Sequence, residues 1–267
     1  MQNIRKHTRK KRKAGRILAG CLIVLLVLGI GRWIAQSGAA GFLPSMHRLS
    51  EGQKERLRRE GCPESLLNLA NRNPETLQFV KDYPKKAQNT GKIDISEDME
   101  KVKDGEIPLF LQWDERWGYR TYGSDCMAVT GCGPTCLSMV YCGLTGQSKN
   151  PYAVAKRAQN NGYYIDGQGS TWDMMSTMAA NMGLTVEDVT FDREHVTKTL
   201  QEGSPIICIM GPGDFTTSGH FIVLAGVDDD GKLIVNDPNS RKNSRKTWDF
   251  DAIRSQIRNL WAYHYEE

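Results

Sequence analysis

The chain has 267 residues, of which 39% are hydrophobic and 25% charged, so it is long enough for one full domain with additional segments. Its formal net charge of +4 is unevenly distributed, because residues 1–16 hold eight basic side chains and no acidic one. The rest of the chain is therefore mildly acidic, which argues against nucleic acid as a partner of its main domain.

An apolar segment follows the basic residues. Residues 17–31 contain no charged side chain and are rich in Leu, Val and Ile, and after Arg32 the apolar character continues to residue 35. A helix needs roughly 20 mostly apolar residues to cross a bilayer, with about 17 as a lower limit. Residues 17–35 are thus predicted to be a transmembrane signal-anchor in contact with the lipid bilayer. Since basic residues stay on the cytoplasmic side, residues 1–16 are predicted to be a cytoplasmic tail, and everything after residue 36 is expected outside the cell membrane.

Two other interpretations of this segment compete with a retained anchor. A cleaved signal peptide is compatible with the small residues Ser37 and Ala39, but the apolar length and the bulky Trp33-Ile34 pair favour the anchor. A lipoprotein processing box ending at Cys21 is excluded, because too little hydrophobic segment precedes that cysteine.

Residues 36–105 are predicted to form a linker and a small helical spacer. Ser50 is a good cap for a helix that ends near Gly61. A second helix is expected to start at Cys62-Pro63, and a third at Asn73-Pro74 with its end at Tyr83-Pro84. The unit contains no catalytic set of residues, so we interpret it as a spacer rather than a propeptide, with residues 85–105 as a second linker.

Residues 106–267 form the predicted main domain, which has an α+β pattern with helices first and strands late. The expected helices lie at 150–159, 170–182 (with a capping-box spacing from Ser170 to Asp173) and 192–202, and the expected strands at 205–210, 220–225, 233–236 and 261–265.

Cys132 is the strongest candidate for a nucleophile. It precedes a segment that reads as a buried helix, with Pro134 in the first turn and Gly143 at the expected end. A thiol at a helix N-terminus lies near unpaired N–H groups and the positive end of the helix dipole, which both lower the thiol pKa. The competing interpretation of this segment alone is a small buried cysteine, which is how most free cysteines behave.

His220 and Asp237 are predicted to meet at the open end of a β-hairpin. His220 starts one strand, the turn Asp228-Asp-Asp-Gly231 reverses the chain, and Asp237 ends the next strand. A carboxylate beside a histidine fixes its tautomer and stabilises the imidazolium, as an acid–base partner of a cysteine requires. Asp237 also suits a turn, since Asp-Pro-Asn-Ser is a strong turn sequence.

The remaining histidines and cysteines offer weaker signals. His195 and His264 have no carboxylate placed by an obvious hairpin. Of the other cysteines, Cys62 and Cys126 remain open as disulfide partners. The cysteines lack the paired spacing of structural zinc sites, so neither a metal nor a cofactor is predicted.

Four sequence blocks occur in an order and at spacings found together in one peptidase group. The main domain resembles the papain-like cysteine peptidases of family thirty-nine, the double-glycine or bacteriocin leader peptidases, and especially their stand-alone relatives. The resemblance covers residues 106–265 and rests on the blocks Gln112-x-Asp-x-x-Trp117, Gly131-Cys-Gly-Pro-Thr-Cys136, Gly219-His-Phe-Ile-Val and Val235-Asn-Asp-Pro238.

The resemblance implies a papain-like fold, in which an N-terminal helix carries the nucleophile and an antiparallel sheet carries His and Asp. It also implies Cys132 as the nucleophile, His220 as the acid–base, Asp237 as the orienting residue and Gln112 as the oxyanion donor. The chain departs from the transporter-borne members, which usually have an acidic residue in place of Gly131 and a glutamine closer to the cysteine. It also has no Walker-type glycine loop, so neither ATP nor export-coupled leader cleavage is implied.

The sequence therefore predicts a membrane-anchored cysteine peptidase that hydrolyses peptide bonds of an extracytoplasmic peptide or protein through an acyl-enzyme. One alternative keeps the thiol but acts on a cell-wall amide or transfers the acyl group. Such cell-wall enzymes often use a second histidine in third place, and Asp237 speaks mildly against them. The other alternative is a non-catalytic peptide-binding module, which would have no need of all three residues.

Overall fold

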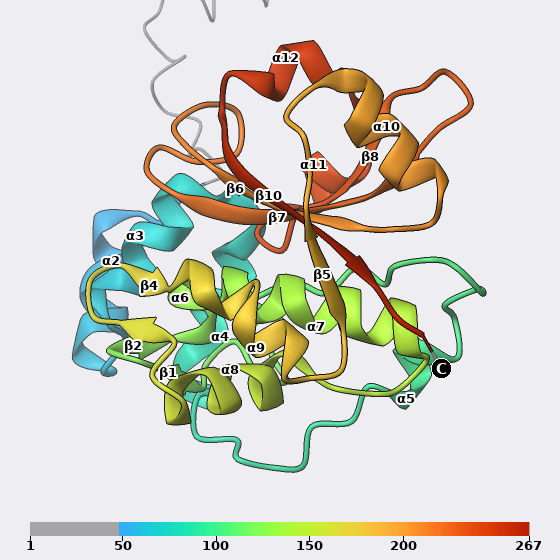
Figure 1. Ribbon diagram of the computed structural model, residues 1–267. Coiled ribbons are helices and arrows are strands. Elements are labelled where there is room, and N and C mark those ends of the chain that lie inside the picture. Colours follow the sequence, from blue (N-terminus) through green and yellow to red (C-terminus); the bar gives the residue numbers. More distant parts are fainter. Residues whose placement is uncertain (1–47, 267) are drawn as a thin grey trace, which may run out of the picture. The chain divides into compact units, whose positions relative to one another are not determined.

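A six-stranded antiparallel sheet, in the order β5-β10-β6-β7-β8-β9, organises the fold (Figure 1). The structure is a computed structural model that describes residues 48–266. The strands are β5 (Thr185–Asp188), β6 (Ile206–Met210), β7 (His220–Val227), β8 (Leu233–Asn236), β9 (Thr247–Trp248) and β10 (Ile257–His264). The α+β class is thus confirmed. The strands β5 and β9 were not predicted, and β7 and β10 are longer than predicted.

The two faces of the sheet are covered by different helices (Figure 1). Successive residues of β6 alternate between two buried clusters, with Ile207 on the side of α7 and Ile206 and Cys208 on the side of α10 and α12. Such alternation is the period-two pattern of a strand buried on both faces. The helices on the second face are α10 (Arg193–Gln201) and α12 (Phe250–Arg254), and α11 (Arg241–Ser244) follows β8.

The other layer is built around one long helix, and it contains short helices and two small hairpins. All residues of this helix from Gly133 to Cys142 are buried, so it forms the centre of the layer. The elements are β1 (Thr121–Tyr122), β2 (Asp125–Cys126), α6 (Met127–Thr130), α7 (Cys132–Thr145), α8 (Pro151–Asn160), β3 (Tyr164–Ile165), β4 (Gly169–Ser170), η3 (Trp172–Met174) and α9 (Thr177–Ala180).

Two predictions in this layer are wrong in detail. The helix expected over 170–182 is replaced by β4, η3 and α9, and the predicted capping box does not form. The reason is that Ser170 pairs with the strand at Tyr164 and bonds the hydroxyl of Tyr122 at 2.8 Å. Gly143 does not end α7, which continues to Thr145 and is closed by Gly146 in the left-handed conformation at φ 66°.

The helical unit before the main domain consists of α2 (Glu51–Arg59), α3 (Glu64–Arg72), η2 (Pro74–Thr76), α4 (Leu77–Lys86) and, further on, α5 (Ser96–Met99). Ser50 caps α2 with a complete capping box, as predicted. The helix α4 runs through Pro84 instead of ending there. The buried side chains of α2–α4, such as Leu57, share one hydrophobic cluster with Leu111 and Trp113. The predicted boundary between residues 105 and 106 therefore crosses a continuous packed cluster.

The predicted cytoplasmic tail and signal-anchor, residues 1–16 and 17–35, lie outside the described residues. In the part of the chain that the structure describes, no helix is long and apolar enough to cross a membrane.

Candidate active site

Cys132 is the first residue of α7 and is half-buried. Its N–H belongs to the first turn, where backbone donors have no intrahelical acceptor. A Cβ on Gly133 would lie 2.7 Å from the Oγ of Ser170, so a larger residue would require this side chain to shift. Cys132 itself lines both of the cavities described below.

His220 and Asp237 meet across the hairpin of β7 and β8. The register pairs Val223 with Asn236, so Asp237 lies one residue further, opposite Ile222 and diagonal to His220. The Nε2 of His220 is 2.8 Å from Oδ1 of Asp237, and the two side chains are only 7% and 1% exposed. The sequence expectation that these two residues lie opposite or nearly opposite each other agrees with this geometry.

The Cys132 thiol and the His220–Asp237 pair shift each other's pKa values in opposite directions. Burial opposes the charged form of His220, but the carboxylate of Asp237 and the Cys132 thiol outweigh it and raise the pKa of His220 to about 10. Burial also opposes the Cys132 thiolate, yet hydrogen bonding and charge from His220, with the N–H groups of Phe221 and Gly133, leave its pKa below the ordinary value. Burial instead raises the pKa of the other described cysteines: Cys62, Cys126, Cys136, Cys142 and Cys208.

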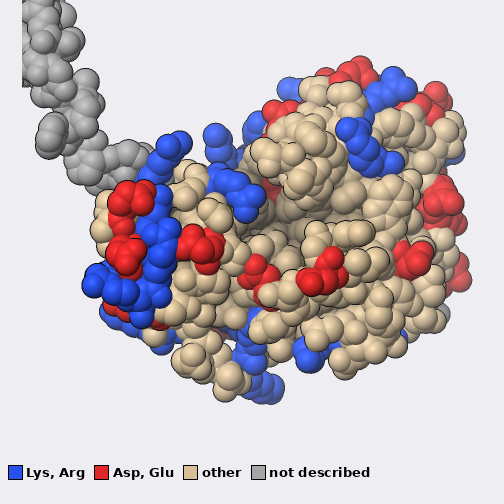
Figure 2. Space-filling view, turned by 90° about the vertical axis from the view of Figure 1, so that its left-hand side faces the viewer, with Lys and Arg blue, Asp and Glu red and all other residues tan. Residues whose placement is uncertain are grey.

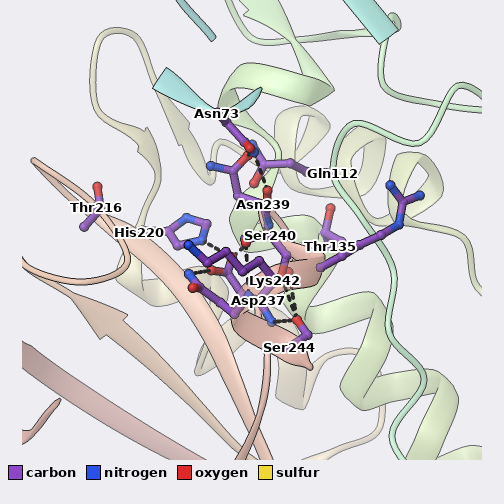
Figure 3. Close-up of polar contacts among 12 residues, drawn as sticks. Asn73, Gln112, Thr135, Thr216, His220, Asp237, Asn239, Ser240, Lys242 and Ser244 are labelled. Atoms are coloured by element: carbon purple, nitrogen blue, oxygen red, sulfur yellow. Dashed lines mark hydrogen bonds and ion pairs between the residues drawn. The ribbon is translucent and has the colours of Figure 1, made fainter. Parts of the chain in front are cut away.

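The loop after β8 holds the carboxylate of Asp237 in place (Figure 3). Oδ1 of Asp237 accepts a hydrogen bond from the backbone N–H of Asn239 at 2.8 Å, in addition to its bond with His220. Oδ2 of Asp237 accepts one from the side-chain amide of Asn243 at 2.8 Å. The backbone N–H of Asp237 donates to the Oγ of Ser244. Because both carboxylate oxygens accept hydrogen bonds, the side chain of Asp237 is held in the orientation that faces His220.

Gln112 lies in the same site and is buried. Its backbone N–H donates to the carbonyl of Pro238 at 2.8 Å, and its side-chain Nε2 donates to the carbonyl of Ala128 at 2.8 Å. An amide Nε2 carries two hydrogens, so the second remains for a group in the cavity that Gln112 lines together with Cys132 and His220.

Two cavities meet at Cys132 and His220. The larger, of about 640 Å³, includes Tyr164 and Trp172 from the β3–β4 side and Phe221 from the sheet. The smaller, of about 410 Å³, is bordered by more polar groups. Figure 2 shows a hollow whose floor is uncharged and whose lower edge carries acidic groups. Cys132 and His220 therefore lie in the middle of a cleft that extends to both sides.

Trp172, Tyr164 and the loop residues 213–219 border the cleft, whereas Tyr163 packs against the core. His195 pairs with Asp192 on the surface, and His264 bonds Ser204.

The cysteines and possible metal ligands add no second centre within residues 48–266. The six cysteines of this part are free thiols, so the structure shows no disulfide for Cys62 or Cys126. No three His, Cys, Asp or Glu side chains of this part gather to hold a metal ion.

Sequence reasoning missed Asn239 and Asn243, which hold Asp237. The only signal was a polar run after Asp-Pro, which indicates a turn but not which of its amides reach the carboxylate.

A family model and a solved structure match the main domain. The model of the Peptidase_C39 like family matches residues 105–266, which is more than half of the chain. One solved structure that the chain matches is the peptidase domain of Streptococcus ComA, a bi-functional ABC transporter involved in a quorum sensing pathway. It is 19% identical, with a TM-score of 0.38, and the match covers 51% of this chain and 93% of that one. No curated protein matches the chain.

Proposed function

Since the chain belongs to the Peptidase_C39 like family and is a cysteine peptidase, we propose that it hydrolyses peptide bonds through a catalytic triad of Cys132, His220 and Asp237, with Gln112 as the oxyanion donor. The observation that carries the proposal is the meeting of a half-buried thiol, a buried His–Asp pair and a buried amide at the junction of two cavities.

Each residue has a defined part in the reaction. The Cys132 thiolate attacks the carbonyl carbon of the scissile bond, and the oxyanion accepts hydrogen bonds from the Cys132 N–H and the second Nε2 hydrogen of Gln112. The C–N bond breaks as His220 gives its proton to the leaving amine, which leaves a thioester on Cys132. His220 then takes a proton from water as the hydroxide attacks the thioester carbon, the C–S bond breaks and the carboxylic acid leaves, which restores the Cys132 thiolate beside the protonated His220. Asp237 keeps His220 in position and stabilises its charged form.

The shape of the cleft favours an extended peptide that continues on both sides of the scissile bond. On one side it would contact Tyr164 and Trp172, a residue that is 50% exposed. On the other it would contact more polar groups, among them Arg72 and Asn73. Since both cavities reach Cys132, residues before and after the scissile bond are expected to contribute to binding.

The test compares the wild-type full chain with Cys132→Ala and His220→Ala. Each protein is incubated with a mixture of denatured proteins, and new peptide termini are identified by mass spectrometry. In parallel, iodoacetamide labelling of Cys132 is followed across a pH series. The wild type is expected to generate new termini and to label Cys132 at neutral pH or below, whereas His220→Ala should move the labelling midpoint upward.

His195→Ala is the matched control, because this histidine has a carboxylate partner but lies on the surface. It should behave as the wild type does. Cleavage that persists in Cys132→Ala would contradict the assignment. If Cys132 labels as an ordinary thiol in the wild type and no termini appear, the peptide-binding module is the better description.

We further propose that residues 17–35 anchor the enzyme in the cell membrane, with the peptidase domain outside. The support is the apolar run after a basic tail. In intact cells, an added protease should degrade the domain but spare residues 1–16, and the chain should stay in the membrane fraction after alkaline extraction. Release of a shortened chain beginning near Ala39 would show a cleaved signal peptide instead.

A further inference from the structure

The N-terminal helical unit, which lies outside the region matched by the family, contacts the loop that holds Asp237. Asn73, between α3 and η2, donates its side-chain amide to the backbone carbonyl of Asn239 at 2.6 Å and to the side-chain oxygen of Asn239 at 3.2 Å (Figure 3). The indole of Trp113 donates to the same backbone carbonyl at 3.0 Å. Asn239, whose N–H donates to the carboxylate of Asp237, is thus also held through its own backbone carbonyl and side-chain oxygen.

Glu75 holds the next residues of the loop. Its Oε1 accepts the hydroxyl of Ser240 at 2.6 Å and the N–H of Lys242 at 3.3 Å, and its Oε2 accepts the N–H of Arg241 at 3.0 Å. A carboxylate that accepts several donors makes stronger hydrogen bonds than a neutral group does. One side chain, 165 residues away from Ser240 in the chain, therefore fixes the start of α11.

The same short segment holds Asp237. Asn239 and Asn243 donate to the two carboxylate oxygens, and Ser244 accepts the N–H of Asp237. Glu75 contacts the residues between these donors, so a shift of this stretch would move the groups that orient the carboxylate toward His220.

Apolar packing also attaches the helices. The helical unit buries Leu57 and Leu66 in a cluster shared with Leu111 and Trp113, and burial of such side chains stabilises this attachment. The contacts of Asn73 and Glu75 instead go to one loop, which is the loop next to the reactive pair. Asn73 also borders the smaller cavity beside Cys132 and His220.

We propose that Asn73 and Glu75 are positioning residues of the peptidase site, and that the helical unit of residues 48–86 is part of the catalytic unit rather than a spacer. Glu75 and Asn73 hold the 239–242 segment, this segment holds Asp237, and Asp237 sustains the charged form of His220. The inference rests on the proposed roles of Cys132, His220 and Asp237.

The test uses the full chain in detergent with Glu75→Ala, Glu75→Gln and, as a matched control, Glu64→Ala. Glu64 lies in the same helical unit and pairs with Arg58 on the surface. For each protein, the pH midpoint of iodoacetamide labelling at Cys132, assigned by peptide mass, is measured together with the melting temperature. Asp237→Ala serves as the reference for a lost carboxylate.

Glu75→Ala is expected to raise the labelling midpoint by about half a unit to one unit, which corresponds to about three- to tenfold slower labelling below the midpoint. The shift should have the direction seen in Asp237→Ala. Glu75→Gln should give a smaller shift, because its amide keeps only one acceptor oxygen. Glu64→Ala should leave the midpoint unchanged.

The outcomes separate this inference from the proposed function. A wild type in which Cys132 labels as an ordinary thiol would overturn the triad, and the positioning role with it. A low wild-type midpoint that both Glu75 variants retain would overturn the positioning role alone, even if the melting temperature falls, because a purely structural contact lowers stability without changing the titration. If Glu75→Ala does not fold, the midpoint of Glu75→Gln decides.

Discussion

Asp237→Asn is the most direct test of how the site keeps His220 charged. The variant has nearly the same shape, and the remaining carbonyl oxygen can still accept from Nε2 of His220, with Asn243 turning its own amide to meet the new NH₂ group. What disappears is the negative charge. The prediction is therefore a lower pKa of His220 in a site that is otherwise intact.

The size of the shift follows from the hydrogen bond. A hydrogen bond to a charged group contributes about 1.5–3 kcal/mol, and one pKa unit corresponds to about 1.36 kcal/mol, so the loss should lower the pKa by about one to two units. The starting pKa is about 10. Because the pKa of His220 is raised in the folded protein, its imidazolium is present at low pH and is lost as the pH rises through this pKa. In Asp237→Asn the imidazolium should be lost at a pH that is about one to two units lower.

The measurement is a pH titration of histidine labelled with ¹³C at Cε1, with the His220 signal assigned from the spectrum of His220→Ala. Asp192→Asn is the matched control, since Asp192 lies 2.7 Å from Nδ1 of His195 on the surface. This control should leave the His220 signal unchanged. A His220 signal that titrates near pH 6.5 in the wild type, or that is unmoved in Asp237→Asn, would refute the electrostatic account of the site.

Three further predictions concern the oxyanion donor, the packing behind the thiol and the helical unit. Gln112→Ala should lower peptide turnover by about 10²–10³ while the pH midpoint of Cys132 labelling stays unchanged, and an equal loss of labelling would argue against an oxyanion role. Gly133→Ala puts a Cβ 2.7 Å from the Oγ of Ser170 and should cost about 1–3 kcal/mol in a denaturant titration. In a background of Ser170→Gly, which itself loses the bond to Tyr122, Gly133→Ala should cost less, and an equal cost in both backgrounds would mean that the contact is not the cause. Leu57→Ala should lower the free energy of unfolding of the whole described unit by about 2–5 kcal/mol in one transition, whereas a separate early transition of the helices would show that they fold independently.

The parts of the site that could be predicted are those where local patterns determine the geometry. The acidic turn before Gly231 and the apolar strands on both sides of it place His220 and Asp237 at one end of a hairpin, and period-two alternation needs no long-range information. The helix after Cys132 was likewise visible from Pro134 and the buried run that follows. Its end was not, because Gly143 is a packing position against Ile107 and not a cap.

The failures have a common physical cause, which is that a tertiary contact competes with a local preference. Ser170 had the spacing of a capping box, yet its hydroxyl bonds Tyr122 and its backbone pairs with Tyr164, so the helix does not start there. Tyr122 is far from Ser170 in the sequence, and no local pattern indicates that Ser170 pairs with Tyr164.

The proposed positioning role of Glu75 could not be predicted from the sequence either. Nothing in the short helical turn that contains it distinguishes its carboxylate from the other surface acids of the unit, and its three partners are backbone and hydroxyl donors that carry no sequence signature. Once the fold places it beside Ser240, however, its effect can reach the reactive pair through few steps, because Asp237 takes its orientation from donors in the same loop. A peptidase domain can thus depend on residues outside its family region, since a triad requires a fixed carboxylate and any neighbouring segment that holds the carboxylate's loop contributes to that requirement.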